Sequence, residues 1–421
     1  MAKFKRYDSY KNSGVEWLVE IPSHWEILAN KYIFKLKRNL VGKRSNKYAL
    51  LSLTLDGIVK RDLDKGGKFP AEFDTYQEVK NGDFVFCLFD VEETPRTIGL
   101  SEYDGMITGA YTVFDVRNIS KKYLYYFYLN LDNNKRLKPL YLGLRNTISK
   151  ENFFSFKTFI PPKDEQEKIA SYLDEKIAKI DASISGKEKF IELLKEQKQI
   201  IINDAVTKGL NKNAKFKNSG VEWLGEIPSH WKFVKLGQIL KPVSIKKRVD
   251  LPLLSITREK GVILRDIENK DVNHNFIPDD LNSYKVVKKG QFVINKMKAW
   301  QGSYGVSEYT GIVSPAYFIF EFDGVEKVFF HRAIRSSAYI PFFIKASDGL
   351  RIGQWDLSKS RMKEILFFIP PKSEQKKIVE YTENKISKID KLLNLEQEYI
   401  KSLKEYKASL IDSVATGKVK V

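Results

Sequence analysis

Residues 11–25 read KNSGVEWLVEIPSHW and residues 217–231 read KNSGVEWLGEIPSHW, so one stretch occurs twice, with one difference in fifteen positions and an offset of 206. A second pair of segments follows the two copies: PPKDEQEKI at 161–169 and PPKSEQKKI at 370–378, at an offset of 209. Both pairs recur in the same order and at nearly the same distance. The 421-residue chain is therefore predicted to consist of two units of one plan.

The composition indicates a folded protein that binds a polyanion. Hydrophobic residues make up 43% and aromatic residues 13% of the chain, which argues against disorder, and the formal net charge is +19. The stretches 163–208 and 372–421 together carry a net charge of only +2, so the other segments hold the remaining +17. An excess this uneven favours nucleic acid as the partner over a solvated surface. No apolar run approaches the roughly 20 residues that span a bilayer, and we expect a cytoplasmic protein.

The two near-neutral stretches are predicted to be long helices. Apolar residues recur in alternating steps of four and three, and this spacing forms a narrow stripe along one face of a helix. Pro-Pro and acidic residues mark the predicted starts, and Gly209 and Gly417 mark the predicted ends. Each stripe could pack on a separate domain, but the simplest partner for each helix is the other, in a rod of roughly 65–70 Å. The stripe consists of Leu173, Ile177, Ile180, Ile184, Ile191, Leu194, Ile386, Ile389, Leu393, Ile400, Leu403 and Leu410.

The two remaining segments share a pattern of strands but differ in their loops. LLSLTLDGIVKRD from Leu50 resembles LLSITREKGVILRD from Leu253, and NGDFVF near Gly82 resembles KGQFVI near Gly290. We therefore predict two similar mixed α/β domains at residues 1–160 and 211–369, joined by helices at 161–210 and 370–421. The copies diverge between the shared strands, for example at 89–97 against 296–304. One scaffold is thus predicted to carry two different surfaces.

Nothing in the sequence predicts catalysis or a bound metal. The chain lacks a P-loop, a nucleophile elbow and a zinc-binding pattern, and neither Pro-Pro pair has the polar residue that a base-flipping methyltransferase uses. The single cysteine, Cys87, lies in the apolar run FVFCLF and is interpreted as a core residue. The repeated His24 and His230 are interpreted as packing or turn residues. We expect a non-catalytic protein without a cofactor of its own.

Candidate DNA contacts lie in the divergent loops. The segment KMKAWQGSY at 296–304 interleaves cations, an amide and aromatic rings after a predicted strand, which suits contacts with phosphates and base edges. Arg145 and Arg351 stand at comparable places before each Pro-Pro, where an arginine can bind guanine, a phosphate or a carboxylate. Basic clusters near residues 43 and 246 are interpreted as phosphate contacts or solvated loops. The candidates are Lys43, Arg44, Thr94, Arg96, Arg145, Lys246, Lys247, Arg248, Lys296, Lys298, Gln301, Tyr304 and Arg351.

Together, the repeated GVEWL and EIPSHW openings, the segments LGLRNTIS and DGLRIGQWDLS, and the two PPK-x-EQ-x-KI helix starts resemble the specificity subunit of type I restriction-modification systems. The resemblance covers both repeats; the first copy lacks the Ser-Asp-Gly that lies shortly before Arg351. It implies two target recognition domains that each bind one half of a split DNA sequence, and an antiparallel coiled coil that gives a pseudo-two-fold repeat. It also implies that the helices dock two modification subunits, which hold S-adenosylmethionine and methylate adenine, and that restriction subunits can join.

The predicted rod length is compatible with this family. Such a rod would separate two DNA-binding domains by one to two turns of DNA, at about 34 Å per turn, which suits two half-sites around an unread spacer. One alternative is a coiled-coil scaffold that binds nucleic acid or acidic partners without sequence specificity. Another, disfavoured by the missing motifs, is an autonomous methyltransferase or nuclease. Divergent loops on matched scaffolds favour the sequence reader.

Overall fold

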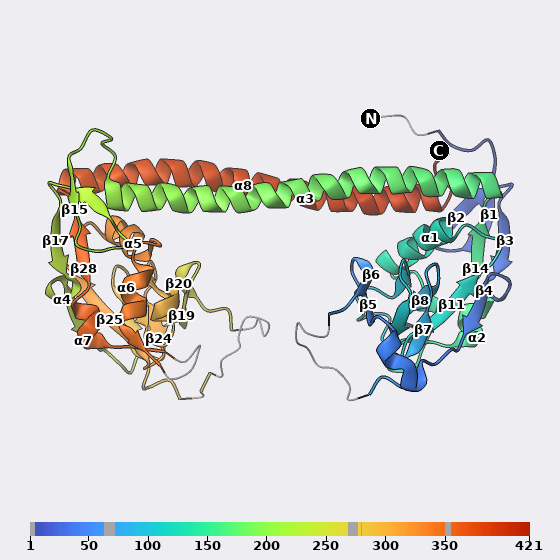
Figure 1. The fold of residues 1–421 in the computed structure, drawn as a ribbon, viewed down its shortest axis with the longest axis horizontal. Helices are drawn as coiled ribbons and strands as arrows, with labels where there is room; N and C mark the ends of the chain where they lie inside the picture. The colour runs from blue at the N-terminus through green and yellow to red at the C-terminus, as the bar shows by residue number, and fades with distance from the viewer. Residues whose placement is uncertain (1–4, 63–71, 268–276, 279, 350–354) are drawn as a thin grey trace. The chain divides into compact units, whose positions relative to one another are not determined.

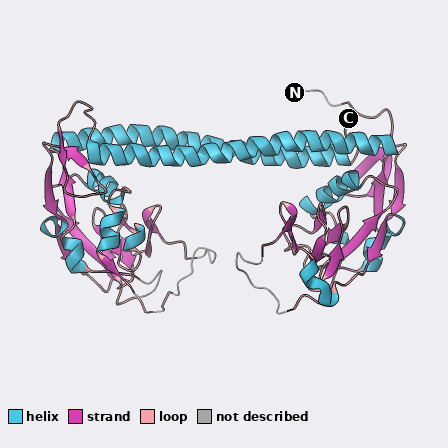
Figure 2. Cartoon of the chain, viewed as in Figure 1, coloured by secondary structure: helices cyan, strands magenta, loops and turns pink. Residues whose placement is uncertain are grey.

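The structure is a computed structural model that describes residues 5–62, 72–267, 277–278, 280–349 and 355–421. The chain divides into two compact units: Met1–Lys187 with Gln397–Val421, and Glu188–Glu396. Each unit contains a strand-rich part and a stretch of both long helices, α3 (Lys163–Lys208) and α8 (Lys372–Ala415) (Figure 1, Figure 2). The predicted boundaries at 160 and 210 bracket α3, whereas the compact units divide within it.

The first unit is built around a four-stranded antiparallel sheet, one face of which is covered by aromatic side chains. Rings of Phe34, Phe86 and Phe114 contact one another with centroids 5.5–5.7 Å apart. Tyr128 and Phe153, from the two helices of this part, pack on the same rings. All five side chains are at most 3% exposed, so they form the centre of the core. The sheet consists, in spatial order, of β4 (Phe34–Lys37), β11 (Thr112–Val116), β8 (Phe84–Phe86) and β9 (Ile98–Leu100), and the helices are α1 (Lys121–Asn133) and α2 (Lys150–Ser155).

Two-stranded antiparallel pairs complete the described part of the first unit. The repeated sequence motif forms a hairpin, in which Glu16 and Trp17 connect the two strands. Trp25, the last residue of the motif, is fully buried, which explains why the motif needs an aromatic residue there. The pairs are β1 (Tyr10–Val15) with β2 (Leu18–Pro22), β3 (Glu26–Ala29) with β14 (Lys157–Ile160), β5 (Leu51–Thr54) with β6 (Gly57–Lys60), β7 (Gln77–Val79) with β10 (Gly105–Ile107), and β12 (Tyr141–Leu142) with β13 (Thr147–Ile148).

The second unit repeats this topology in its described residues. Phe84 pairs with Phe114 in the first sheet, and Phe292 pairs with Phe320 at the same place in the second. The repeat in sequence is therefore a repeat of the fold, which confirms the predicted pair of similar mixed α/β domains. The second sheet consists, in spatial order, of β18 (Leu240–Val243), β25 (Tyr317–Phe322), β22 (Phe292–Asn295) and β23 (Tyr304–Val306). The two-stranded pairs are β15 (Phe216–Asn218) with β16 (Glu226–Pro228), β17 (Lys232–Lys235) with β28 (Leu366–Ile369), β19 (Leu254–Thr257) with β20 (Gly261–Leu264), β21 (Lys285–Val287) with β24 (Gly311–Val313), and β26 (Ser347–Asp348) with β27 (Asp356–Leu357). The helices are α4 (Leu236–Ile239), α5 (Lys327–Arg335), α6 (Ile340–Lys345) and α7 (Lys359–Lys363).

The long helices pack against each other in antiparallel fashion within each unit. In the first unit, Leu173 from the start of α3 shares a core with Leu410 and Val414 from the end of α8. In the second unit, Nζ of Lys198 on α3 lies 2.6 Å from Oδ1 of Asp390 on α8. Every residue of the predicted apolar stripe is buried or half-buried, so the prediction that the helices are partners is confirmed.

Polar residues such as Lys187 and Lys407 interrupt the apolar stripe, and each has a partner on the other helix. The predicted helix ends are confirmed. Lys407 donates to both carboxylate oxygens of Asp181 at 2.7 Å, and Lys187 lies 4.9 Å from the ring centre of Tyr399. Gly209 and Gly417 follow the two helices with φ of +72° and +75°, the left-handed conformation that glycine adopts without a Cβ clash.

Candidate nucleic-acid interface

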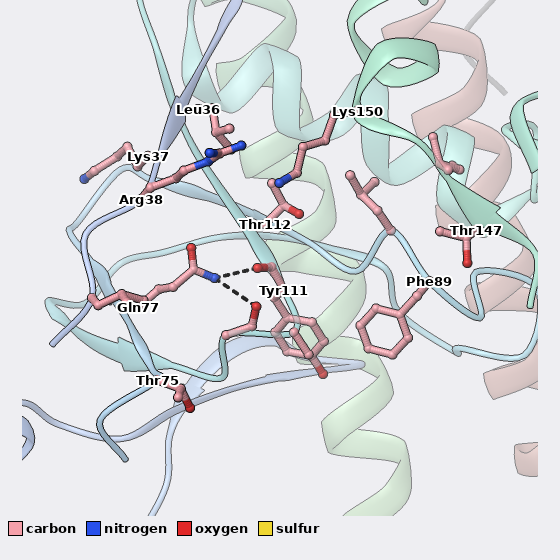
Figure 3. Close-up of a pocket in the computed structure, with 15 residues that line it drawn as sticks. Leu36, Lys37, Arg38, Thr75, Gln77, Phe89, Tyr111, Thr112, Thr147 and Lys150 are labelled. Carbon is pink, nitrogen blue, oxygen red and sulfur yellow. Dashed lines mark hydrogen bonds between the residues drawn. The ribbon is translucent and has the colours of Figure 1, made fainter. Parts of the chain in front are cut away.

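A cleft of about 630 Å³ opens beside the central sheet of the first unit. Strands β4, β7 and β11 contribute to its walls, together with the segments that follow β8 and β10 and the start of α2 (Figure 3). Its lining combines cations, amides, hydroxyls and aromatic rings, which are the groups that contact phosphates, base edges and base faces. The labelled lining residues are Leu36, Lys37, Arg38, Thr75, Gln77, Phe89, Tyr111, Thr112, Thr147 and Lys150.

Two half-buried aromatic rings lie together in this cleft. Phe89 and Tyr111 are nearly parallel, with an interplanar angle of 21° and centroids 6.2 Å apart (Figure 3). Arg145 lies 5.8 Å from the ring centre of Phe89, and its guanidinium forms two hydrogen bonds with Asp90, at 3.1 and 2.6 Å. This ion pair lowers the pKa of the Asp90 carboxyl. The exposed arginine is thus held beside the aromatic pair by a carboxylate.

Gln77 is a buried polar residue of the cleft lining whose amide is held by two hydrogen bonds. Its side chain is 8% exposed, and its Nε2 donates to the backbone oxygens of Tyr111 at 2.6 Å and Gly109 at 3.4 Å. The Oε1 atom is directed away from both carbonyls (Figure 3). The amide therefore ties β7 to the segment between β10 and β11 with its donor and presents its acceptor on the other side.

The second unit carries lysines at positions that correspond to this cleft. An isolated bridge joins Leu40 to Gln77 in the first unit and Lys246 to Lys285 in the second. The backbone oxygens of Leu88 and Lys296 accept equivalent hydrogen bonds from β13 and β27, at 2.8 and 2.9 Å. Lys150 and Lys359 are the first residues of α2 and α7, each after a serine N-cap. We call these four residues of the second unit the lysine cluster: Lys246, Lys285, Lys296 and Lys359. They correspond, in this order, to Leu40, Gln77, Leu88 and Lys150 of the first unit.

Lys285 is the half-buried centre of the lysine cluster. Its Nζ donates to the backbone oxygen of Tyr317 at 2.8 Å, the counterpart of the bond from Gln77 to Tyr111. Burial, reinforced by the charges of the three other lysines, lowers the pKa of Lys285 from its ordinary value. Lys296 pairs with Asp356 at 2.9 Å, which offsets part of the charge. A cluster of like charges such as this favours binding of a ligand rich in acceptors.

Most of the residues predicted from sequence to contact DNA are exposed. Lys43 and Arg44 lie in a short 3₁₀ helix, η2 (Gly42–Lys47). Lys246, Lys247 and Arg248 lie in the exposed segment after β18, where Arg248 forms two 2.7 Å hydrogen bonds with Asp250. In the loop after β22, Lys298 is exposed and Lys296 and Gln301 are half-buried. Arg351 lies outside the described residues.

The structure corrects one of the predicted contacts and shows how two others are held. Tyr304 is 0% exposed and its ring stacks on Phe343 with centroids 4.1 Å apart, so it is a core residue and not a DNA contact. The side chain of Arg96 is half-buried, at 13% exposed, and bonds to Asp132 and Asn133, both at 2.9 Å; its contact with DNA stays a prediction. The sequence pattern did not indicate that Tyr304, four positions beyond Trp300 in a loop rich in polar groups, begins a buried strand. Thr94 donates its hydroxyl to the backbone of Asp90 at 2.7 Å and stabilises the loop.

Sequence reasoning missed Gln77, Lys150, Lys285 and Lys359. The signal was present, because TYQEVKNGDFVF at 75–86 aligns with SYKVVKKGQFVI at 283–294 and sets Gln77 against Lys285. Only the strand pairing shows that this position borders the cleft.

In the described part of the chain, no helix is long and apolar enough to cross a membrane. Among the same residues, no group of three or more His, Cys, Asp or Glu side chains is placed to hold a metal ion.

Comparison with family models identifies part of the chain. Residues 102–193 match the family model described as the type I restriction modification DNA specificity domain. The resemblance to the specificity subunit of type I restriction-modification systems is thereby confirmed, and the matched residues are a specificity domain of that family.

Three solved structures are similar to this chain, and the one with a TM-score above 0.5 shows the same fold. A chain described under "Structural basis underlying complex assembly and conformational transition of the type I R-M system" matches with a TM-score of 0.64 and 12% identity, over 95% of this chain and 99% of that chain. The HsdS subunit from Thermoanaerobacter tengcongensis matches with a TM-score of 0.48 and 14% identity, over 95% of this chain and 98% of that one. The S subunit from M. genitalium gives a TM-score of 0.37 and 14% identity, over 97% and 99%.

Proposed function

We propose that this chain is the non-catalytic DNA sequence-specificity subunit of a type I restriction-modification complex and acts in the cytoplasm. Each strand-rich domain binds one half of a bipartite double-stranded target. The observation that carries the proposal is the contrast at matched positions: one scaffold presents Gln77 in the first unit and Lys285 in the second. Different donors and acceptors on the same scaffold are what two unlike half-sites require.

The long helices take two roles in this proposal. They fix the number of base pairs between the half-sites, because α3 of 46 residues and α8 of 44 residues each contribute to both units. They also dock two modification subunits, and restriction subunits can join the assembly. Helix α8 exposes apolar side chains that would serve this docking: Leu392, Leu395, Tyr399 and Tyr406, which are 43–59% exposed.

The chemistry of the complex then lies in the partners. The modification subunits would hold S-adenosylmethionine and methylate adenine, whereas this chain selects the sequence. Purified alone, the chain should transfer no methyl group from S-adenosylmethionine to duplex DNA. Methyl transfer by the chain alone would contradict the non-catalytic role.

Methylation mapping tests the proposal directly. Long-read sequencing of genomic DNA from cells with and without the gene should show one bipartite methylated motif that depends on this chain. An unchanged methylation map would overturn the proposed function. Competition binding adds a second test: a scrambled duplex that competes as well as the motif would favour a nonspecific nucleic-acid scaffold instead.

A further inference from the structure

Gln77 and Lys285 occupy the same position on the two copies of the scaffold. Gln77 pairs with Ile107 and bridges to Leu40, and Lys285 pairs with Val313 and bridges to Lys246. Both side chains donate a hydrogen bond to the backbone oxygen of an equivalent tyrosine, Tyr111 at 2.6 Å or Tyr317 at 2.8 Å. The scaffold therefore holds the Gln77 amide and the Lys285 ammonium at equivalent places in the two units. The units differ there in the donors and acceptors that the bond to the tyrosine leaves unused.

The remaining groups have opposite hydrogen-bonding character. An ammonium group has three donors, so Lys285 keeps two after it binds Tyr317. An amide that has used its Nε2 keeps an acceptor, and Oε1 of Gln77 is directed away from its partners (Figure 3). The second unit thus offers donors at the position where the first offers an acceptor.

The anchoring of Lys285 distinguishes it from its neighbours in the lysine cluster. Lys246 and Lys359 are exposed, which suits contacts with phosphates, whereas Lys285 is half-buried and fixed by Tyr317. A base-specific contact needs a donor at a defined position, because base edges are distinguished by the pattern of donors and acceptors. In the major groove, guanine presents two adjacent acceptors, O6 and N7, and lysine is a common partner for them.

We propose that Lys285 binds the O6 and N7 acceptors of a guanine in the half-site of the second unit, and that Gln77 accepts from an exocyclic amino group, of adenine or cytosine, in the half-site of the first. This inference rests on the proposed function and specifies which chemistry each unit selects. The exposed lysines around Lys285 contact the flanking phosphates, and their charges are balanced when DNA binds.

Selection from a duplex pool with randomised half-sites tests the inference, with the full-length chain and modification subunits present. Lys285→Gln should reduce the preference for guanine at one position of one half-site, by roughly 5- to 100-fold, and leave the other half-site unchanged. Lys285→Arg should retain guanine, because arginine also binds O6 and N7. Lys289→Gln is the matched control: this lysine is exposed in the turn after β21 and loses the same charge, so the motif should not change.

The reciprocal variant Gln77→Lys gives an independent test that does not depend on the folding of Lys285→Gln. Lysine can keep the bond to the Tyr111 carbonyl, as Lys285 does with Tyr317, so the first half-site should now select guanine at one position. A Lys285→Gln protein that selects the unchanged motif with weaker binding to every sequence would show a phosphate contact and overturn the inference. An unchanged first half-site in Gln77→Lys would also count against it. A wild-type chain that enriches no motif would instead contradict the proposed function.

Discussion

The indole Nε1 of Trp25 donates a hydrogen bond to Oε1 of Glu165 at 3.0 Å, and the same bond joins Trp231 to Glu374 at 3.2 Å. In both units the other carboxylate oxygen lies 2.8 Å from Nε2 of the preceding histidine, His24 or His230. The repeated Ser-His-Trp motif therefore attaches each strand-rich part to the first turn of a long helix. This contact explains why the motif and the Pro-Pro-Lys-x-Glu-Gln segment recur together.

Glu165→Ala should destabilise the first unit. The buried indole N–H of Trp25 would lose its acceptor, at a cost of about 1–3 kcal/mol. In a unit of this size each kcal/mol corresponds to about 2–4 °C, so the thermal midpoint of the full chain should fall by several degrees. Glu167→Ala, in the same turn but exposed, is the matched control and should change the midpoint little. Equal effects of the two variants would mean that the carboxylate contributes only through the helix dipole.

Much of the framework was predictable because its signals are local and repeated. The apolar stripe, the acidic first turns and the terminal glycines predicted α3 and α8, and Leu173 and Leu410 show the stripe in the core. These features depend on residues a few positions apart, and the same pattern occurs twice. The duplication also predicted that the two domains share one topology.

The interface was less predictable, because burial of a polar or aromatic side chain depends on strands far apart in sequence. Tyr304 stands among polar residues, yet β23 places it inside the sheet, against Phe343. Arg96 is basic and lies in a divergent loop, but its partner is Asp132 on α1, 36 residues further along the chain. Aligning the two copies sets Lys285 against Gln77, but only the bridge from Lys285 to Lys246 reveals the lysine cluster.

Tyr304→Phe should leave DNA binding unchanged. The ring is fully buried, and among the described residues its hydroxyl has no hydrogen-bond partner, so the variant removes a desolvated polar group and keeps the stacking on Phe343. We expect equal or higher thermal stability and the same affinity for target DNA, measured by calorimetry and fluorescence anisotropy. A clear loss of affinity with an intact melting curve would restore Tyr304 as a contact.

The second unit should lose stability in mild acid because of His331. Burial, together with the charges of Arg335 and Arg332, lowers the pKa of His331 from 6.5 to about 4. Below pH 6.5 the unfolded chain takes up a proton at this residue and the folded chain does not. The free energy of unfolding is therefore at its full value above pH 6.5. It decreases by up to about 3 kcal/mol as the pH falls towards 4.

Urea unfolding of the full chain between pH 7.5 and 4.5 checks this dependence. The neutral imidazole accepts a hydrogen bond at Nδ1 from the backbone N–H of Val306, at 3.1 Å. His331→Asn keeps an acceptor in the same direction but does not titrate, so its urea midpoint should fall less over this range. Parallel pH profiles for the two proteins would show that His331 is not responsible.

Lys359→Ala should weaken DNA binding in a salt-dependent way. Lys359 is exposed at the start of α7, beside the half-buried Lys285, and Lys150 holds the same position in the first unit. A lysine that neutralises one phosphate contributes about 0.9 to the slope of log affinity against log salt concentration. Lys359→Ala and Lys150→Ala should therefore each make the slope shallower by about one while the preferred sequence stays the same. Lys391→Ala removes an exposed lysine from α8 and serves as the control for lost charge, and its slope should match the wild type. Slopes that stay equal in all three variants would place the DNA away from the starts of α2 and α7.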